Sequence, residues 1–329
     1  MVSRIRLIVF AVVLLLVATA CQPAAPGGAD AGPTPITLAL GYIPNVQFAP
    51  YYVAAERGYF AEEGIDITLE TIFESESVPL VGAGELQFAI ASAEQVLLAR
   101  SQGLPVVYVT KWWQDYPIAI AAKTASGIVT PEDLRGRTVG LPGLYGASYI
   151  GLRALLNSAG LAESDIQLES IDFTQVPSLA EDRVEAVVVY ANNEPVQLKS
   201  AGFDINVIRV ADYITLASNG LVTNETTIAN QPELVRGMAR AILRGLADTL
   251  ADPDAAFEIC LIYVDTLSAD DAVQRQVLAE SVAMWQTDQL GASSPESWLA
   301  TQSVLLSMGL LSEPVDLAAA YTNDFLPEN

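Results

Sequence analysis

The sequence predicts an α/β fold with two domains, and three observations support this prediction. From residue 36 onward, short apolar segments of strand length alternate with segments of helical spacing, which is typical of sheets covered by helices. The 329 residues are enough for two domains of medium size, each with its own core. The strand-like segments end near residue 223, and almost everything after them is predicted to be helical.

Strands are predicted wherever a short apolar run is bounded by turn residues. These runs are residues 37–42, 67–72, 88–91, 106–110, 117–122, 138–141, 166–171, 186–190, 205–210 and 221–223. Apolar residues spaced three and four apart, often with a glycine after the last one, predict helices between and after the strands. The predicted helices are residues 48–57, 78–81, 93–101, 147–159, 179–183, 194–200, 232–250, 254–264, 269–288, 295–308 and 315–324.

The N-terminus is predicted to be an export signal that does not belong to the fold. Arg4 and Arg6 form a short positive region, and residues 7–17 are an unbroken apolar run that is too short for a comfortable membrane span. The run ends in VATAC, whose small residues before Cys21 resemble the lipobox of bacterial lipoproteins. We therefore expect residues 1–20 to be a signal peptide and Cys21 to be lipidated. The mature protein would be exported and anchored to the outer face of the cell membrane.

A tether is predicted between this anchor and the folded part. Residues 22–35 are rich in proline, glycine and alanine and show no apolar period, so we expect residues 21–35 to be a lipid-anchored flexible linker. The alternative is an ordinary signal peptide cleaved near Ala20, in which case Cys21 has no special role. If Cys21 is lipidated, Cys260 has no disulfide partner, and its apolar neighbours predict a small core residue.

Charge and composition exclude several classes of function. With 16 basic and 39 acidic residues the formal net charge is −23, and loss of Arg4 and Arg6 with the signal peptide would leave 14 basic residues and a charge of −25. Such an acidic chain repels phosphate backbones, so nucleic-acid binding is not expected. The chain has no histidine and two cysteines, which excludes a zinc site of cysteine and histidine and any histidine-assisted nucleophile. No metal, cofactor or catalytic residue is predicted.

Four motifs in the chain resemble those of one family of transport proteins. They are GYIPN at 41–45 followed by APYYVAAERGYFAEEGI at 49–65, GAGELQFAIAS at 82–92, DLRGRTVG at 133–140 and QPELVR at 231–236. The chain resembles the solute-binding proteins of ABC importers that belong to the sulfonate, nitrate and thiamine-pyrimidine group (SsuA/NMT-like), a branch of the type II periplasmic binding proteins. The resemblance extends from about residue 36 to about residue 250.

The resemblance implies two α/β lobes joined by a hinge, with a ligand held between them. We place the chain crossings near Tyr116 and Asn219, so that residues 36–116 and 220–329 form lobe I and residues 117–219 form lobe II. The resemblance also implies a monomer that delivers its ligand to an ABC permease in the membrane. The stretch VVYANNEP at 188–195, together with residues 88–95 and 143–149, further resembles the riboflavin-binding branch of this family.

The ligand site is predicted beyond the carboxyl ends of the strands, where ligands of open α/β sheets collect and helices present free N–H groups. Five loops meet this condition. Their candidate ligand-binding residues are Tyr42, Asn45, Gln47 and Phe48 after the first strand, Ser92 and Glu94 after the third, Trp112, Trp113 and Tyr116 after the fourth, Tyr145 and Gly146 after the sixth, and Tyr190, Asn192, Asn193 and Glu194 after the eighth.

Some of these residues also have simpler interpretations. Ser92 and Asn193 are candidates for helix caps, and the glycines of residues 142–149 are compatible with an ordinary turn. Trp112 and Trp113 point in opposite directions if the chain is extended, so one can be a core residue while the other faces the ligand.

The candidate loops contain one basic residue, Lys111, and are rich in aromatic and amide side chains. A sulfonate or phosphate site would need arginine or several oriented donors, so this composition favours a neutral planar heterocycle. Riboflavin is our first choice, and the alternatives are a formylated aminopyrimidine precursor of thiamine or an alkanesulfonate. Fungal members of the wider family are enzymes that make the thiamine pyrimidine from a histidine of their own chain with a cysteine-rich iron-binding motif. Since this chain has no histidine and no such motif, we expect that it is not an enzyme.

Overall fold

The computed structural model describes residues 32–327. Apart from the first residue of β1, every element below lies in one compact unit, Pro35–Asn329. The predictions for the signal peptide, for Cys21 and for most of the linker concern residues outside the described part. Within residues 32–327, no helix is long and apolar enough to cross a membrane.

The first sheet has five strands in the order β2-β1-β3-β10-β4. They are β1 (Thr34–Gly41), β2 (Ile65–Phe73), β3 (Phe88–Ser92), β4 (Val106–Lys111) and β10 (Asn219–Asn224). β1 and β3 are parallel, whereas β10 runs antiparallel to β3 and to β4. As a result, Asn219 at the start of β10 lies opposite Ser92 at the end of β3.

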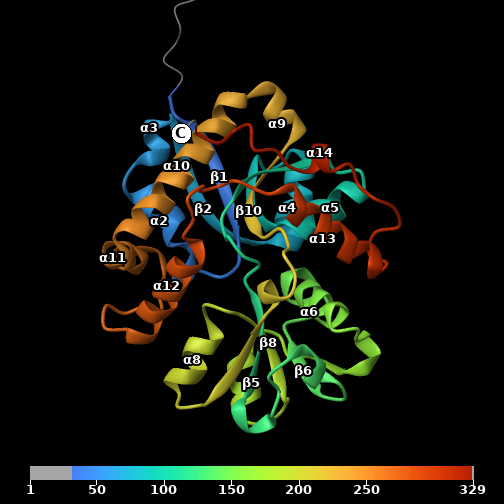
Figure 1. Ribbon diagram of the computed structural model, residues 1–329. Helices are drawn as coiled ribbons and strands as arrows, with labels where there is room; N and C mark the ends of the chain where they lie inside the picture. Colours follow the sequence, from blue (N-terminus) through green and yellow to red (C-terminus); the bar gives the residue numbers. More distant parts are fainter. Residues whose placement is uncertain (1–31, 328–329) are drawn as a thin grey trace, which may run out of the picture. The chain divides into compact units, whose positions relative to one another are not determined.

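Helices cover both faces of this sheet (Figure 1). On one face are α2 (Ala49–Glu56), α10 (Pro232–Ala251), α11 (Pro253–Tyr263) and α12 (Ala272–Trp285), and on the other are α4 (Glu74–Ala83), α5 (Ala93–Ser101), α13 (Pro295–Ser307) and α14 (Leu317–Ala320). The strands supply side chains to both faces in turn, since Leu38 and Leu40 pack with α2 and α10 while Ala39 packs with α4 and α5. Short helices complete this part, which we call lobe I: η1 (Val46–Phe48), α3 (Tyr59–Glu62) and α9 (Glu225–Asn230).

The second sheet also has five strands, in the order β7-β6-β8-β5-β9. They are β5 (Ile118–Lys123), β6 (Thr138–Leu141), β7 (Gln167–Ser170), β8 (Ala186–Tyr190) and β9 (Ile205–Arg209). β6 is parallel to β7 and β8, and β5 is antiparallel to β8 and β9. The helices of this part, which we call lobe II, are α6 (Gly146–Ser158), α7 (Gln175–Ala180), α8 (Glu194–Ser200), η2 (Thr124–Ser126), η3 (Pro131–Leu134), η4 (Glu163–Asp165) and η5 (Val210–Asp212).

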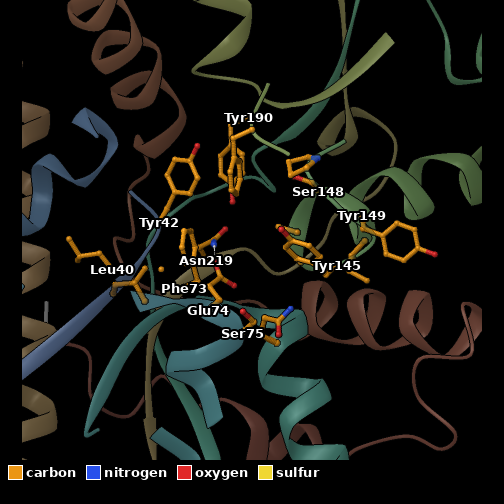
Figure 2. Close-up of a pocket in the computed structure, with 18 of the residues that line it drawn as sticks. Leu40, Tyr42, Phe73, Glu74, Ser75, Tyr145, Ser148, Tyr149, Tyr190 and Asn219 are labelled. Carbon is orange, nitrogen blue, oxygen red and sulfur yellow. Dashed lines mark hydrogen bonds between the residues drawn. The ribbon is translucent and has the colours of Figure 1, made fainter. Parts of the chain in front are cut away.

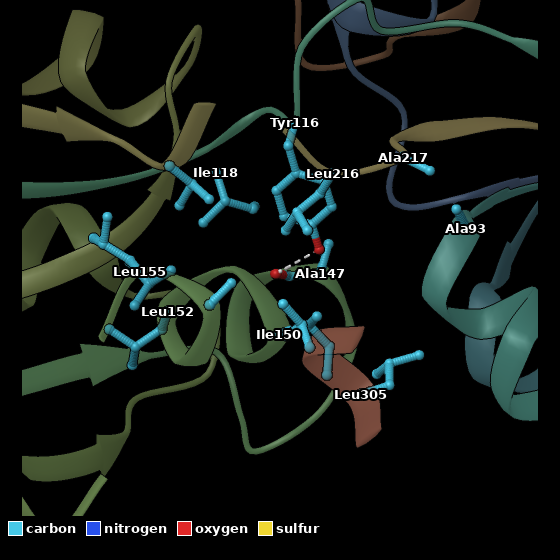
Figure 3. Packing of buried hydrophobic residues seen from close by; sticks show 14 of the residues in the cluster. Ala93, Tyr116, Ile118, Ala147, Ile150, Leu152, Leu155, Leu216, Ala217 and Leu305 are labelled. Atoms are coloured by element: carbon cyan, nitrogen blue, oxygen red, sulfur yellow. Dashed lines mark hydrogen bonds between the residues drawn. The ribbon is translucent and has the colours of Figure 1, made fainter. Parts of the chain in front are cut away.

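Two chain segments, residues 112–117 and 213–218, connect the two sheets. Apolar side chains from these segments pack against the start of α6 and against α13 (Figure 3). Tyr116 of the first segment is buried there and donates a hydrogen bond from its hydroxyl to the carbonyl oxygen of Ala147 at 3.0 Å. The lobes are therefore joined by a packed core at the connections.

The two mixed sheets with their helices confirm the predicted α/β class, and all ten predicted strands are present within three residues of their predicted ends. The helices deviate more. α4 begins earlier than predicted and contains Pro79, which cannot donate a helical hydrogen bond. α9 was not predicted, although Asn224 caps it by accepting a hydrogen bond from the backbone N–H of Thr227 at 2.7 Å. Cys260 is a free, fully buried core residue of the described chain, as predicted.

Candidate functional site

A cavity of about 540 Å³ lies between the lobes, beyond the ends of the strands of both sheets. Its wall is built from both lobes and from the connections. From lobe I and the first connection it is lined by Leu40, Gly41, Tyr42, Gln47, Phe48, Phe73, Glu74, Ser75, Glu76, Ile90, Gln95, Leu98, Trp112, Asn219 and Leu310. From lobe II it is lined by Pro142, Leu144, Tyr145, Gly146, Ala147, Ser148, Tyr149, Ile150, Phe173, Gln175, Tyr190, Asn193 and Glu194.

The turn after β1 directs Tyr42 into this cavity. Gly41 has a positive φ of 82°, and a Cβ atom at this position would lie 2.7 Å from the carbonyl oxygen of Ile90. Only glycine tolerates both the left-handed backbone and this close approach. The chain can therefore leave β1 sharply, and Tyr42 follows on the wall that faces lobe II (Figure 2).

Aromatic rings form the apolar part of the wall. Phe48 stacks on Trp112 with ring centroids 5.4 Å apart, and Trp112 is 5% exposed and lines the cavity. Trp113 does not line the cavity and packs in the core, where its ring lies 5.3 Å from that of Trp285 and 5.1 Å from that of Trp112. The sequence left open which tryptophan lines the cleft, and in the structure Trp112 lines the cavity.

A network centred on Glu74 forms the polar wall on the lobe I side. One carboxylate oxygen of Glu74 accepts hydrogen bonds from the backbone N–H of Ser92 at 2.9 Å and from its hydroxyl at 2.5 Å. The other accepts one from the side-chain amide of Asn219 at 3.0 Å. Burial raises the pKa of Glu74 above its usual range, while these three hydrogen bonds oppose that shift. Figure 2 shows Glu74 and Asn219 next to each other on this wall.

A second carboxylate, Glu194, faces the cavity from lobe II at the start of α8. It accepts hydrogen bonds from the backbone N–H of Tyr190 at 2.9 Å and from the side-chain amide of Asn193 at 3.3 Å. Burial raises the pKa of Glu194 to about 7. Across the cavity, burial and then the charge of Glu194 raise the pKa of Tyr42 to about 12. This phenol therefore stays protonated and can donate a hydrogen bond to a ligand.

Nine of the residues chosen from the sequence line the cavity: Tyr42, Gln47, Phe48, Trp112, Tyr145, Gly146, Tyr190, Asn193 and Glu194. The structure brings them together from both lobes. The other six do not line the cavity: Asn45, Ser92, Glu94, Trp113, Tyr116 and Asn192.

Three of these six make hydrogen bonds that explain their positions. Asn45 caps η1 by accepting a hydrogen bond from the backbone N–H of Gln47 at 3.0 Å. Ser92 makes no side-chain cap on α5, because its hydroxyl is engaged by Glu74. The side-chain amide of Asn192 donates to the hydroxyl of Ser281 on α12 at 2.8 Å, which ties lobe II to lobe I.

Glu94 lies fully buried at the start of α5, and neither of its carboxylate oxygens has a hydrogen-bond partner among the described residues. Burial and then the charge of Glu74 raise its pKa to about 8. It is therefore protonated near neutral pH and stands behind the cavity wall.

Sequence reasoning missed, among other residues, four that the structure brings into the wall. Phe73 ends β2, Glu74 follows it, and Phe173 follows β7, so the rule of strand carboxyl ends could have selected these three. Asn219 carried no such signal, because it stands at the amino end of its strand. It reaches the cavity only since β10 runs antiparallel to its neighbours.

The charge of the cavity wall is one-sided. Within residues 32–327, the wall contains the carboxylates of Glu74, Glu76 and Glu194 and no lysine or arginine. Among the described residues, no group of three or more metal-binding side chains could hold a metal ion. The wall can thus offer aromatic faces, amide and hydroxyl groups and carboxylates to a ligand.

Comparisons with known proteins agree with this geometry. The NMT1/THI5 like family matches residues 45–256. The riboflavin-binding protein RibY of Chloroflexus aurantiacus is 42% identical over 98% of this chain and 98% of its own. The chain belongs to the NMT1/THI5-like family. Its other relatives include the formylaminopyrimidine-binding protein of Halalkalibacterium halodurans, 29% identical over 88% of this chain and 89% of that protein.

Other relatives of the chain are enzymes, and solved structures provide more distant neighbours. A 4-amino-5-hydroxymethyl-2-methylpyrimidine phosphate synthase of Legionella pneumophila is 24% identical over 89% of this chain and 92% of that protein. The periplasmic aliphatic sulphonate-binding protein SsuA of Escherichia coli superposes with a TM-score of 0.73, at 15% identity, over 87% of this chain and 97% of that one. This chain therefore has the two-lobed fold of SsuA-type periplasmic binding proteins.

Proposed function

We propose that this protein is the solute-binding component of an ABC importer and that it captures riboflavin in the cavity between its lobes. The observation that carries the proposal is the cavity wall, which combines the aromatic rings of Tyr42, Trp112 and Tyr190 with amides and carboxylates and has no basic residue. Aromatic faces stack on flat rings, and amides form hydrogen bonds with the polar atoms at the edge of a ring. The 42% identity to a riboflavin-binding relative over almost the whole chain supports the same ligand.

The size of the cavity favours riboflavin over a single pyrimidine ring. Cavities that enclose a drug-sized ligand typically measure about 300–1,000 Å³, and this one measures about 540 Å³. A formylated aminopyrimidine, the second candidate, is supported by the relative that binds it, but it would leave much of the cavity unfilled. An alkanesulfonate, the third, would bring its negative charge to a wall that contains Glu74, Glu76 and Glu194.

A binding role accounts for the residues better than an enzymatic role does. The chain has no histidine, and Cys260 is buried in the core of lobe I with its pKa raised to about 12 by burial. Among the described residues, neither a histidine to be consumed nor a reactive thiolate is therefore present at the cavity. Purified protein incubated with pyridoxal phosphate and iron should yield no pyrimidine product, and formation of such a product would overturn the binding-only assignment.

The proposal includes export and a partner in the membrane. Cys21 would carry the lipid anchor, residues 21–35 would be the tether, and an ABC permease would receive the ligand when the lobes open about the connections at 112–117 and 213–218. Mass spectrometry of protein extracted from membranes should find an acylated Cys21 at the N-terminus. An unmodified N-terminus at another residue would contradict the anchor.

The ligand itself is best tested with protein purified from its own host without added ligand. We expect the protein to be yellow and fluorescent, and extraction with solvent followed by mass spectrometry should identify riboflavin. Extraction of an aminopyrimidine or a sulfonate instead would reassign the ligand while keeping the protein in the binding class.

A further inference from the structure

Asn219 lies at the cavity wall and has a buried hydrogen-bond acceptor that finds no donor in the described part of the chain. Its side chain is only 4% exposed and lines the cavity, and its Oδ1 atom has no hydrogen-bond partner among the described residues. Leaving a buried acceptor without a donor costs about 1–3 kcal/mol. Buried polar groups nearly always have a partner, so an open acceptor on the wall of a cavity points to a group of the ligand.

Glu74 fixes the direction of this acceptor. A carboxylate only accepts hydrogen bonds, so the amide nitrogen of Asn219 must face it, and the two atoms lie 3.0 Å apart. Glu74 is itself held by the backbone N–H and the hydroxyl of Ser92, which is fully buried. Because Ser92 and Asn219 are opposite each other on β3 and β10, the sheet register holds the whole chain of contacts. Oδ1 of Asn219 is thus the end that is left for a ligand.

We propose that Oδ1 of Asn219 accepts a hydrogen bond from a ring N–H of the ligand, with Glu74 as the positioning residue. The inference rests on the proposed function, and for riboflavin the donor is the imide N–H of the ring. Tyr42 and Tyr190 lie next to Asn219 in the same part of the cavity, so that a flat ring placed against them presents its edge to this acceptor (Figure 2). A neutral amide acceptor suits a neutral donor, whereas an anionic group would lie close to the carboxylate of Glu74.

The inference is tested with three flavins on the wild-type protein. Riboflavin carries the imide N–H, N3-methylriboflavin lacks it, and lumiflavin keeps it but lacks the ribityl hydroxyls. Without this hydrogen bond, N3-methylriboflavin should bind about tenfold or more weakly than riboflavin. Calorimetric titration measures both affinities. Equal affinity for these two flavins would overturn the inference and leave riboflavin binding intact. Failure of the wild type to bind riboflavin at all would overturn the proposed function.

Two variants separate a direct contact from a structural role. The first variant is Asn219→Ala, and the second is Glu74→Gln, whose amide no longer fixes the orientation of Asn219. In both variants riboflavin and lumiflavin should bind about tenfold more weakly than to the wild type, whereas the affinity for N3-methylriboflavin should not fall further. A variant that weakens all three flavins alike would contradict the inference, because it indicates a general loss of structure. If Asn219→Ala weakens the binding of riboflavin but not that of lumiflavin, the donor is a ribityl hydroxyl, and the contact with the ring edge is overturned.

The matched control is Asn230→Ala. Asn230 is an exposed asparagine at the end of α9 and does not line the cavity. We expect this variant to keep both the affinity for riboflavin and the discrimination against N3-methylriboflavin. Thermal unfolding of each variant checks that it folds, and the comparison of flavins on the wild type does not depend on any variant.

Discussion

Tyr42 of lobe I and Phe173 of lobe II meet across the cavity in an edge-to-face contact, with ring centroids 5.2 Å apart and ring planes at 68°. Phe173 also stacks almost parallel on Phe73 of lobe I, at 6.4 Å. All three rings line the cavity, and Phe73 and Phe173 are both more than 40% exposed. Asp172, the residue before Phe173, has a positive φ of 49°, which is uncommon for a residue with a side chain. The lobes are therefore linked at the rim of the cavity by aromatic rings.

This contact predicts that Phe173 slows the escape of the ligand. Aromatic pairs of this kind contribute about 0.5–1.5 kcal/mol beyond area burial, so Phe173→Ala should speed dissociation by about threefold to tenfold. Stopped-flow measurement of riboflavin release checks this expectation. Val129→Ala removes an exposed apolar side chain of lobe II that does not line the cavity, and it should leave the release rate unchanged. An unchanged rate in Phe173→Ala would show that the rings do not restrain the ligand.

The neighbours Asn192 and Asn193 should have opposite phenotypes. Asn192 is fully buried and bonded to Ser281, so Asn192→Ala should lower the free energy of unfolding of the unliganded protein by about 1–3 kcal/mol. Asn193 lines the cavity and supports Glu194, so Asn193→Ala should mainly weaken ligand binding. Urea unfolding and calorimetric titration of both variants measure the two effects. Equal loss of stability in both would contradict this division.

The buried carboxyl of Glu94 predicts that the folded protein loses stability as the pH rises. Its pKa is raised from 4.5 to about 8, so between these values the unfolded chain has released a proton that the folded protein retains. The free energy of unfolding should therefore fall between about pH 4.5 and pH 8 and level off above. Glu74 and Glu194, whose pKa values burial also raises, contribute in the same direction.

Glu94→Gln removes the titratable carboxyl group, so the free energy of unfolding should depend less steeply on pH. Urea unfolding at several pH values tests it, with Glu313→Gln, at an exposed carboxylate, as the control that keeps the wild-type slope. A Glu94→Gln variant with the full wild-type slope would show that Glu94 is not the group that titrates.

The acidic wall predicts discrimination by charge. A phosphorylated flavin brings an anion toward Glu74, Glu76 and Glu194, and the cavity has no lysine or arginine to receive it. We expect it to bind about tenfold or more weakly than riboflavin. Competition titrations measure the ratio, which should shrink as added salt screens the repulsion. Equal binding at low salt would contradict the role of the carboxylates.

Most of the fold could be predicted from the sequence because its strands are short apolar runs with clear ends. Ala186–Tyr190 and Thr138–Leu141 were predicted to the residue. The exception is α4, where a helix was predicted only over residues 78–81, whereas the helix extends from Glu74 to Ala83 although it contains Pro79. Here tertiary packing overrides a local preference, since the buried Ser77, Val78 and Val81 hold the segment against the sheet.

The site could be predicted only in part, for a reason that lies in strand direction. The rule of carboxyl ends finds residues after parallel strands, such as Tyr42 after β1. An antiparallel strand brings its amino end to the same edge, so Asn219 could not be found without the pairing of β10. The sequence also could not separate residues on the wall from those behind it. Asn192 and Asn193 are adjacent and chemically alike, yet only Asn193 faces the cavity.

Calorimetric titration of riboflavin into the unliganded protein measures whether riboflavin binds in the cavity between the lobes. We predict saturable binding of one riboflavin per chain, accompanied by quenching of flavin fluorescence as the ring stacks on Trp112 or on the tyrosines of the wall. The absence of binding heat and of quenching at saturating riboflavin, with a protein that is folded by circular dichroism, would contradict the proposed function.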